Sequence, residues 1–325
     1  MNIEASHLSD AERRRLERIE RARRNRRGRK KPAEVPARLT RTSAFAPKRR
    51  GLITDSDFRR LYVVAKQSVI EVSGRELGSQ HRDGLYALFR VKRTRRLGNS
   101  GPKTGLTFPF EYEAVTTWRE LLALMNRQQH TNNLLTLLDV FRDIKKVVIT
   151  IFEGDPEEIL AAQKRGVLAG SGGHAGNIIN DIIWGGVDLD SEVLIIYGSW
   201  SAKMMQKAHL VSLNADVQFA LKSDHAKSFW PYIDSQNSHN FVDEDMLAAL
   251  AGRNLWTAPE TSATRSQFRK DCRQAFDDMV LAGGLKSWRE DVRGKGRRKS
   301  RRYHYVHALE RQMELGLAEV AAVGG

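Results

Sequence analysis

Three arginines stand one helical turn apart in the stretch TSATRSQFRKDCRQAFDDMVLAGG, residues 261–284. Arg265, Arg269 and Arg273 run beside the apolar stripe of this predicted helix rather than opposite it. A guanidinium can donate two parallel hydrogen bonds to O6 and N7 of guanine, or it can bind a phosphate. Charges that only solubilise a helix would lie on its far side. The spacing therefore predicts a helix whose basic N-terminal half lies on a polyanion while its apolar C-terminal half is anchored.

The apolar stripe consists of Phe268, Cys272, Phe276 and Met279, at positions i, i+4, i+8 and i+11. A solvated helix stabilised by local ion pairs is the alternative interpretation of the same stretch. The candidate DNA-binding residues of this helix are Ser262, Thr264, Arg265, Ser266, Arg269, Lys270 and Arg273.

A second basic feature follows in RGKGRRKSRR, residues 293–302, which contains glycines and no acidic residue. Strand-like segments, LKSW and RYHYVHA, flank it, so it is predicted to be the loop of a hairpin. A basic loop of this kind is typical of a wing that lies along a phosphate backbone or in a minor groove. Together with the helix it favours DNA binding over a solvated surface. Its candidate DNA-binding residues are Arg293, Lys295, Arg297, Arg298, Lys299, Arg301 and Arg302.

The net charge of +15 is concentrated in two segments. Residues 1–50 carry 17 Lys and Arg against 6 Asp and Glu, and residues 286–302 carry 9 against 2, so the remaining chain is slightly acidic. Local clusters of positive charge are typical of polyanion binding, whereas solubility alone needs only dispersed charge.

A weaker set of candidates lies in TNNLLTLLDVFRDIKK, a helix predicted for the first half of the chain. Asparagine can pair with N6 and N7 of adenine, but the same residues can equally cap the helix. This region therefore binds DNA weakly or forms a protein interface, and the residues leave both open. Its candidates are Thr131, Asn132, Asn133, Thr136, Lys145 and Lys146.

A DNA-processing enzyme is the alternative from a different functional class. A recombinase or relaxase would use Tyr303 or Tyr305 with His304 and His307. Residues alternate between the two faces of a strand, so His304 should face away from both tyrosines, and no Arg-His-x-x-Arg set precedes them. We therefore expect a non-catalytic protein with no catalytic residue.

Composition excludes several other classes. A single cysteine, Cys272, rules out a disulfide framework, and the nine histidines show no metal-ligand spacing, so no metal and no cofactor are expected. No run of about 18 apolar residues could span a membrane, and no apolar leader is present. We expect a cytoplasmic bacterial protein associated with nucleoid or plasmid DNA.

The order of predicted elements indicates an α+β protein with tandem winged-helix domains. A basic, largely disordered arm covers residues 1–50. A first domain covers 51–222 and adds a sheet and a Gly-rich loop near 166–177. A second covers 223–325 and ends in the basic wing and a C-terminal helix. In both domains a helix, a short helix and a third helix precede a strand, which is the order of a winged helix.

Local signals predict further details of these elements. Thr117 is a predicted N-cap of the helix TWRELLALM, with Glu120 at its third position. In the helix SDHAKSFWPYIDSQ, Phe229, Trp230 and Ile233 are predicted to face inward. The segment LVSLNADVQFAL is predicted to be a strand.

The stretches RTSAFAPKRRG, VSGRELGSQHRDGLYALFRV, TWRELLALM and ATRSQFRKDCRQAFDDMVLAGGL resemble the TrfA-like family of plasmid replication initiators. The resemblance covers about residues 40–310. It implies tandem winged-helix domains that bind repeated sites, the iterons, in double-stranded DNA of a plasmid origin. It further implies origin opening, plasmid copy control, recruitment of the host replicative helicase and initiator proteins, and possible self-association. A winged-helix transcriptional regulator is the alternative within the DNA-binding class.

Overall fold

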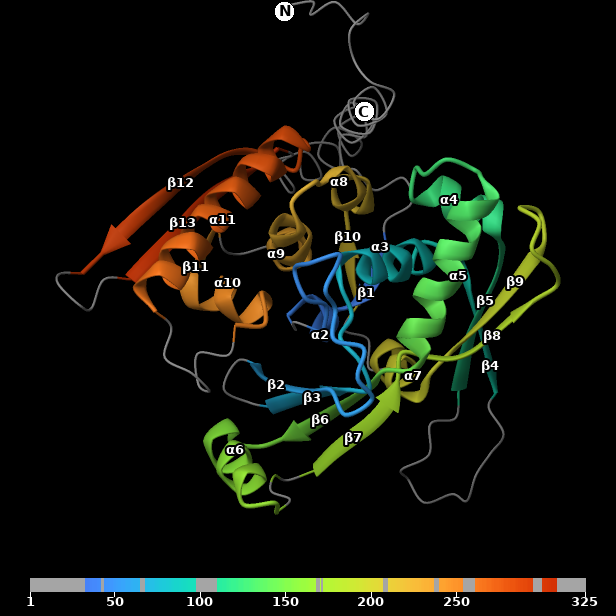
Figure 1. Cartoon of the computed structure of the whole chain (residues 1–325), viewed down its shortest axis with the longest axis horizontal. Coiled ribbons are helices and arrows are strands. Elements are labelled where there is room, and N and C mark those ends of the chain that lie inside the picture. Colours follow the sequence, from blue (N-terminus) through green and yellow to red (C-terminus); the bar gives the residue numbers. More distant parts are fainter. Residues whose placement is uncertain are drawn as a thin grey trace, which may run out of the picture. The chain divides into compact units, whose positions relative to one another are not determined.

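The computed structural model describes residues 33–41, 44–64, 68–97, 110–167, 170, 172–206, 210–236, 240–253, 261–294 and 300–308. Among these residues, contacts divide the chain into two units. Ala33–Ser212 with Ala248–Glu260 form the N-terminal unit, and Leu213–Leu247 with the residues from Thr261 onward form the C-terminal unit. Figure 1 shows the mixture of helices and strands in both. No helix of the described ranges is long and apolar enough to cross a membrane.

Two four-stranded antiparallel sheets form the framework of the N-terminal unit. The first has the order β2-β3-β6-β7, with strands β2 (Arg59–Val64), β3 (Ser68–Ser73), β6 (Val148–Glu153) and β7 (Gly172–Asn177). The second has the order β4-β5-β9-β8, with strands β4 (Arg93–Leu97), β5 (Phe110–Thr117), β9 (Glu192–Tyr197) and β8 (Ile179–Trp184). Short β1 (Ala33–Pro36) pairs with β10 (Leu210–Leu213).

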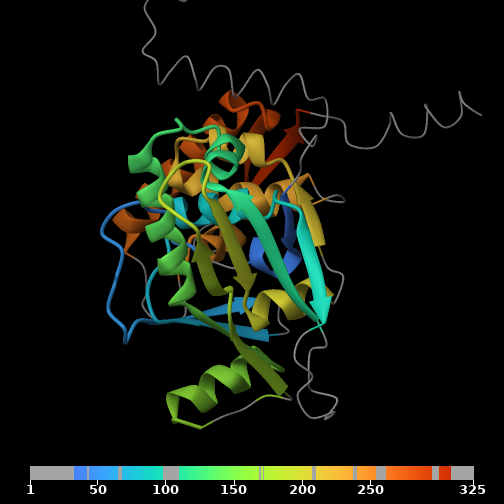
Figure 2. The same cartoon turned by 90° about the vertical axis from the view of Figure 1, so that its right-hand side faces the viewer.

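Three helices of this unit contact one another: α3 (Ser79–Leu88), α4 (Trp118–Leu124) and α5 (Thr131–Lys145). Their apolar faces bury Leu85, Trp118 and Phe141 completely. The predicted cap of α4 is confirmed, because the Thr117 hydroxyl accepts a hydrogen bond from the backbone N–H of Glu120 at 3.1 Å. Smaller helices complete the unit: α2 (Ala37–Thr40), α6 (Pro156–Lys164) and α7 (Ser199–Gln206). In both views α6 lies beyond the ends of β6 and β7 (Figures 1 and 2).

The structure differs from the sequence-based arm at residues 33–50. Residues 33–41 form β1 and α2 within the N-terminal unit, and Val35 and Leu39 are buried there. These two apolar residues are isolated among charged and proline positions, so they give no periodic signal. Residues 1–32 lie outside the described residues, as does the C-terminal helix predicted after residue 308.

Part of the predicted Gly-rich loop near 166–177 is the edge strand β7. Its glycines permit close packing on both sides. A Cβ on Gly173 would lie 2.7 Å from the carbonyl oxygen of Ile151, and one on Gly176 would lie 2.3 Å from Oγ of Ser199. A strand with three glycines among its six residues has no hydrophobic alternation, which is why its sequence predicts a loop.

A second close approach yields a stability prediction. Gly198 joins β9 to α7, and a Cβ at this position would lie 2.1 Å from the carbonyl oxygen of Asn177. Because backbone cannot yield cheaply, Gly198→Ala should destabilise the protein by about 1–3 kcal/mol. Thermal unfolding measures the effect. Gly172→Ala is the matched control, since nothing lies within 4 Å of its added methyl group; equal melting temperatures for the two variants would refute the close packing.

The C-terminal unit places two long helices against a three-stranded antiparallel sheet. The sheet order is β11-β13-β12, so β13 lies in the middle and pairs with β11 on one side and β12 on the other. Figure 1 shows α11 running along the hairpin of β12 and β13. The elements are α8 (Ala215–Ala220), α9 (Asp224–Ser235), β11 (Phe241–Asp243), the start of α10 (Glu244–Leu250), α11 (Ser262–Leu281), β12 (Leu285–Arg293) and β13 (Ser300–His307).

The core of this unit lies between α9, α11 and the sheet. The predicted stripe of α11 is buried throughout, and Phe229, Trp230 and Ile233 of α9 face it as the sequence predicts. Asp278 fixes the two helices to each other, because its Oδ2 accepts hydrogen bonds from the backbone N–H groups of Lys222 and Ser223 at 2.6 and 2.8 Å. A buried carboxylate thus satisfies the two backbone N–H groups just before α9, whose cap is Ser223 through its hydroxyl and the N–H of Ala226.

The two units differ in how the strands that flank their helices are paired. In the N-terminal unit β5, before α4, pairs with β4 and β9, whereas β6, after α5, pairs with β3 and β7. The two strands therefore lie in different sheets, unlike β11 and β12 of the C-terminal unit. The segment LVSLNADVQFAL, predicted to be a strand, divides into β10 and α8 because the side chain of Asn214 caps a helix by accepting from Val217 N at 3.3 Å.

Candidate nucleic-acid interface

Helix α11 exposes a polar surface along its N-terminal half. Thr261 caps the helix, with its hydroxyl accepting a hydrogen bond from the N–H of Thr264 at 3.2 Å. The cap therefore fixes where this half of α11 begins. The side chain of Ser262 lies outside the described residues. The exposed candidates on this half are Thr264, Arg265, Ser266 and Lys270, and sequence reasoning missed exposed Gln274 one turn further on.

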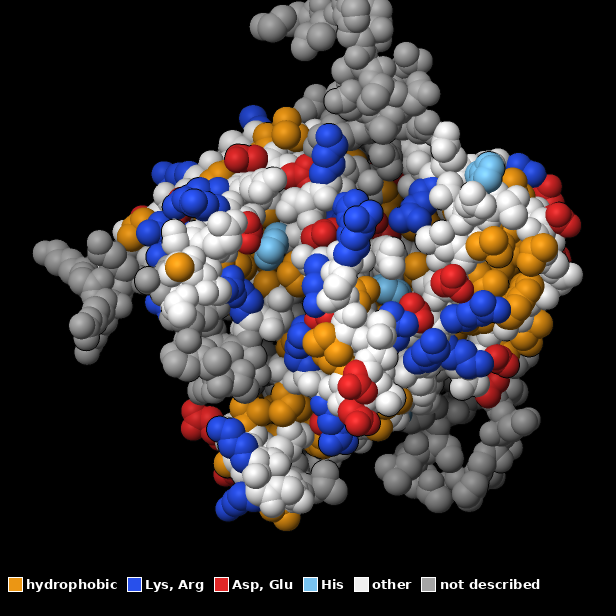
Figure 3. Space-filling view, in the orientation of Figure 1, with side chains coloured by type: hydrophobic (Ala, Val, Ile, Leu, Met, Phe, Trp, Pro, Cys, Tyr) orange, Lys and Arg blue, Asp and Glu red, His pale blue; other side chains and the backbone are white. Residues whose placement is uncertain are grey.

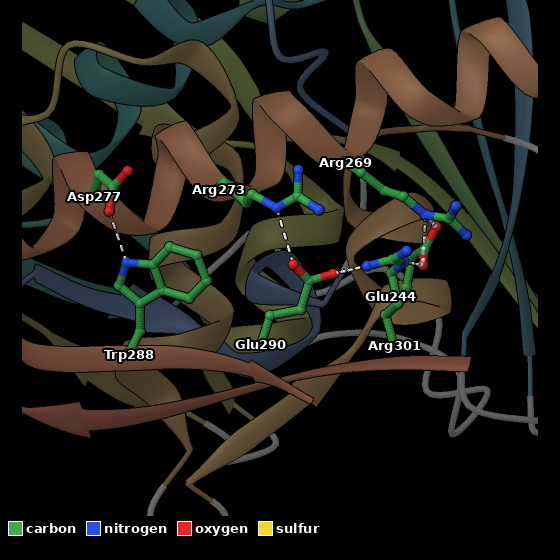
Figure 4. Close-up of polar contacts among 7 residues, drawn as sticks. All are labelled: Glu244, Arg269, Arg273, Asp277, Trp288, Glu290 and Arg301. Carbon is green, nitrogen blue, oxygen red and sulfur yellow. Dashed lines mark hydrogen bonds and ion pairs between the residues drawn. The ribbon is translucent and has the colours of Figure 1, made fainter. Parts of the chain in front are cut away.

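The other two arginines of the row are held by glutamates of the same unit. Arg269 Nε donates to both carboxylate oxygens of Glu244, at 2.9 and 3.2 Å. Arg273 Nε donates to Oε2 of Glu290 at 2.9 Å. Figure 4 shows both contacts reaching from α11 to residues below it in this view, which belong to α10 and β12. The three arginines of the predicted row are therefore not equivalent: Arg265 is exposed, and Arg269 and Arg273 are partly buried and bound to glutamates.

Arg301 of β13 connects these two pairs. Its Nη1 donates to Oε1 of Glu290, and its Nε lies 3.8 Å from Oε2 of Glu244. Burial raises the pKa of Glu290, but the hydrogen bonds and charges of Arg273 and Arg301 together lower it below its usual value, so the carboxylate stays ionised. We call these five residues, Glu244, Arg269, Arg273, Glu290 and Arg301, the arginine–glutamate network.

The hairpin contributes further basic residues with mixed roles. Arg302 pairs with Asp243, Nε to Oδ1 at 2.7 Å, and its guanidinium lies 3.9 Å from the ring centroid of Phe241. The backbone of Arg293 ends β12, but its side chain lies outside the described residues. Lys295, Arg297, Arg298 and Lys299 also lie outside them. The predicted strand–loop–strand order is present, with β12 and β13 antiparallel on either side of this loop. Figure 3 shows Lys and Arg side chains over the region of α11 and the hairpin.

The two tyrosines of β13 are core residues. Tyr303 and Tyr305 are buried, and the ring of Tyr303 stacks on Phe276 with centroids 5.2 Å apart. Burial raises the pKa of both phenols well above its usual value. His304 instead lies by Phe241 and Asp291. A nucleophilic tyrosine must be reachable and readily deprotonated, and neither phenol meets these conditions.

The candidates of the N-terminal unit lie around α5 and are partly used within it. His130, not Thr131 to Asn133, caps the helix, since its Nδ1 accepts from the N–H of Asn132 at 3.2 Å. The remaining candidates make local contacts: Asn133 Nδ2 to Gln128 O at 2.8 Å, Thr136 Oγ1 to Asn132 O at 2.8 Å, Lys145 to Asp181 at 2.8 Å and Lys146 to Asp143 at 3.4 Å. Thr131, Asn132 and Thr136 remain exposed on the first turns.

No protein-family model matches this sequence, and a comparison with curated proteins finds no match. Solved structures with a similar fold include domains of RctB and the Pi initiator protein. Two structures of domains 2 and 3 of RctB have TM-scores of 0.49 and 0.47 at 10% and 11% identity, and each covers 83% of this chain and 98% or 96% of its own. The Pi initiator protein in complex with iteron DNA has a TM-score of 0.40 at 12% identity, covering 70% of this chain and 90% of its own. At these values the function of this chain has to be argued from its own residues, and the TrfA-like resemblance stays a prediction.

Proposed function

We propose that this chain is a non-catalytic initiator that binds repeated sites in double-stranded DNA of a plasmid replication origin. In this proposal the C-terminal unit acts as a winged helix, with the N-terminal half of α11 in the major groove and the β12–β13 hairpin along the backbone. A second winged helix in the N-terminal unit, origin opening and recruitment of the host helicase and initiator proteins belong to the same proposal. Iteron DNA is the ligand of the Pi initiator protein, and the proposed target is of that class.

One observation carries the proposal. Helix α11, with its exposed polar half, and the β12–β13 hairpin, whose sequence includes the basic run 293–302, belong to one folded unit, and α11 packs on β12. A helix that offers short polar side chains with Arg265 and Lys270 can contact base edges. The basic run 293–302 supplies sequence-independent phosphate binding in this proposal. The buried, high-pKa tyrosines support a role in binding rather than in strand cleavage.

Selection of bound duplexes from a random pool at about 150 mM salt tests this function, because non-specific binding is weak there. Enrichment of a motif that recurs in tandem near the encoding gene is the expected result. A single palindrome beside a promoter would favour the transcriptional regulator instead. No enriched motif would mean that the protein binds phosphates only, and the initiator proposal would fail.

Lys270→Ala is the mutation that tests the α11 surface most cleanly. The Lys270 side chain is exposed and forms no ion pair with a described residue, so its loss leaves the fold intact. We expect affinity for the selected site to fall by about 1–3 kcal/mol, with less effect on random DNA. Fluorescence anisotropy with both duplexes measures this. Lys164→Ala, an exposed lysine of α6 in the other unit, removes the same charge and should change neither affinity.

A further inference from the structure

The arginine–glutamate network places two carboxylates behind the proposed reading helix. Three guanidiniums share two carboxylates, so the network keeps one net positive charge. The side chains of Glu244 and Glu290 are only 14% and 16% exposed, whereas that of Arg273 is 43% exposed. Arg269 is 23% exposed and Arg301 20% exposed. The glutamates are therefore the most covered members of the network, and Arg273 is its most exposed one.

The geometry of the pairs leaves one edge of each arginine available. Both Arg269 and Arg273 are held through Nε, and no described residue accepts a hydrogen bond from their Nη groups. In Figure 4 the glutamates meet the Nε side of each guanidinium. The Nη pair is an edge with which arginine can contact O6 and N7 of guanine. A guanidinium fixed in this way loses less conformational entropy when it binds.

The same carboxylates reduce the electrostatic attraction between these arginines and phosphate groups. A free arginine near the backbone neutralises a phosphate of any sequence and releases counterions. An arginine with a glutamate beside it carries little net charge, so the phosphate gains much less from it. Its directional hydrogen bonds to a base edge remain. A binding site gains selectivity when contacts common to all sequences, such as those with phosphate, are weakened while a contact with one base is held in place.

We propose that Glu244 and Glu290 are specificity-determining positioning residues of the DNA-binding surface. They hold Arg269 and Arg273 for contact with base edges and prevent these arginines from binding phosphates indiscriminately. This inference rests on the proposed function of α11 and names the residues that set its selectivity.

The test compares Glu244→Gln and Glu290→Gln with the wild-type chain on the selected duplex and on a random duplex. Glutamine keeps the shape of the side chain and removes its charge. Affinity for random DNA should rise, affinity for the selected site should rise less or fall, and the ratio of the two should drop by about tenfold, the value of one modest base contact. The salt dependence on random DNA should steepen by about 0.9 in log–log slope for each arginine that gains a phosphate.

Asp271→Asn is the charge-matched control. Asp271 lies on the same helix, accepts a hydrogen bond from Gln267 at 2.9 Å and takes no part in the network. Its loss raises the net charge by the same amount, so it should leave the ratio and the slope nearly unchanged. A second comparison repeats Glu290→Gln in an Arg273→Gln background. If Glu290 acts through Arg273, most of its effect on the ratio should disappear there.

The outcomes separate this inference from the proposed function. Equal changes on both duplexes, or the same change in Asp271→Asn, would show that only net charge matters and would overturn it. Partial unfolding lowers binding to both duplexes and cannot steepen the slope, so a fall in both affinities with an unchanged slope also overturns it. If the wild-type chain shows no preferred site, the proposed function fails with the specificity role. The slope on random DNA then still reports whether the glutamates restrain the arginines.

Discussion

Neutralising the tip of the hairpin should weaken binding to every duplex by about 10³-fold at 150 mM salt, if each of four basic residues neutralises one phosphate. The change replaces Lys295, Arg297, Arg298 and Lys299 with glutamine. The reason is counterion release, which makes the affinity depend on salt with a slope of about −0.9 for each phosphate contacted. The slope should therefore become shallower by about 3–4, while the ratio between selected and random DNA stays the same. Anisotropy titrations from about 50 to 300 mM salt give both quantities.

Arg301 and Arg302 are left unchanged in this variant for a structural reason. Both are already paired within the C-terminal unit, Arg301 with Glu290 and Arg302 with Asp243. Their removal would disturb the sheet as well as the charge, and the two effects could not be separated. Of the segment predicted to be a wing, Arg301 and Arg302 are therefore paired within the protein, and residues 295–299 lie outside the described residues.

Replacing Arg13, Arg14, Arg15 and Arg18 with glutamine is the control for net charge. These four residues lie in the basic N-terminal segment, and their replacement removes the same amount of charge as the hairpin variant does. Residues 1–50 are the other positive cluster, so some loss of affinity is expected. It should be smaller than the loss in the hairpin variant, because β12, which leads into residues 295–299 in the sequence, packs on α11, the proposed reading helix. An equal loss and an equal change of slope would contradict a specific role for the hairpin tip. A loss confined to the selected duplex would instead mean that the tip contacts bases.

Local signals in the sequence predicted the helices and the hairpin well. The cap at Thr117, the apolar stripe of α11 and the inward face of α9 all depend on residues within a few positions of each other. Such signals persist because a helix satisfies its backbone groups within one segment. The antiparallel strands after α11 were likewise evident, since two apolar, aromatic segments flank a loop that is basic and contains glycine.

Longer-range features could not be predicted in the same way. Glu244 is 25 positions from Arg269, and Glu290 is 17 positions from Arg273, so only the folded sheet brings these groups together. The charge pattern of α11 alone therefore indicated three free arginines. The edge strand β7 was missed for a related reason, because its glycines are required by neighbours elsewhere in the chain. Pairing between distant segments leaves no periodic signal in either one.

Phe276→Ala should have the largest effect on stability, about 3–5 kcal/mol. Phe276 is fully buried and joins α11 to the sheet, with ring centroids 5.2 Å from Tyr303 and 5.4 Å from Trp288. Its removal loses buried apolar area and the ring contacts with Tyr303, Trp288 and Tyr305, and it leaves a cavity that rigid neighbouring rings cannot fill. Urea unfolding followed by tryptophan fluorescence measures the loss of stability. Hydrogen exchange of peptides from α11 shows whether the helix itself has loosened.

Leu281→Ala on the same helix is the matched control for this prediction. Leu281 is 58% exposed at the last residue of α11, so the same kind of truncation there should cost less than about 0.5 kcal/mol. Equal costs for the two variants would contradict the assignment of Phe276 as the anchor of the helix. If the assignment holds, Phe276→Ala should also weaken binding to the selected duplex more than to random DNA. Base contacts require α11 to be held in a fixed position on the sheet, whereas phosphate binding by the basic loop tolerates its displacement.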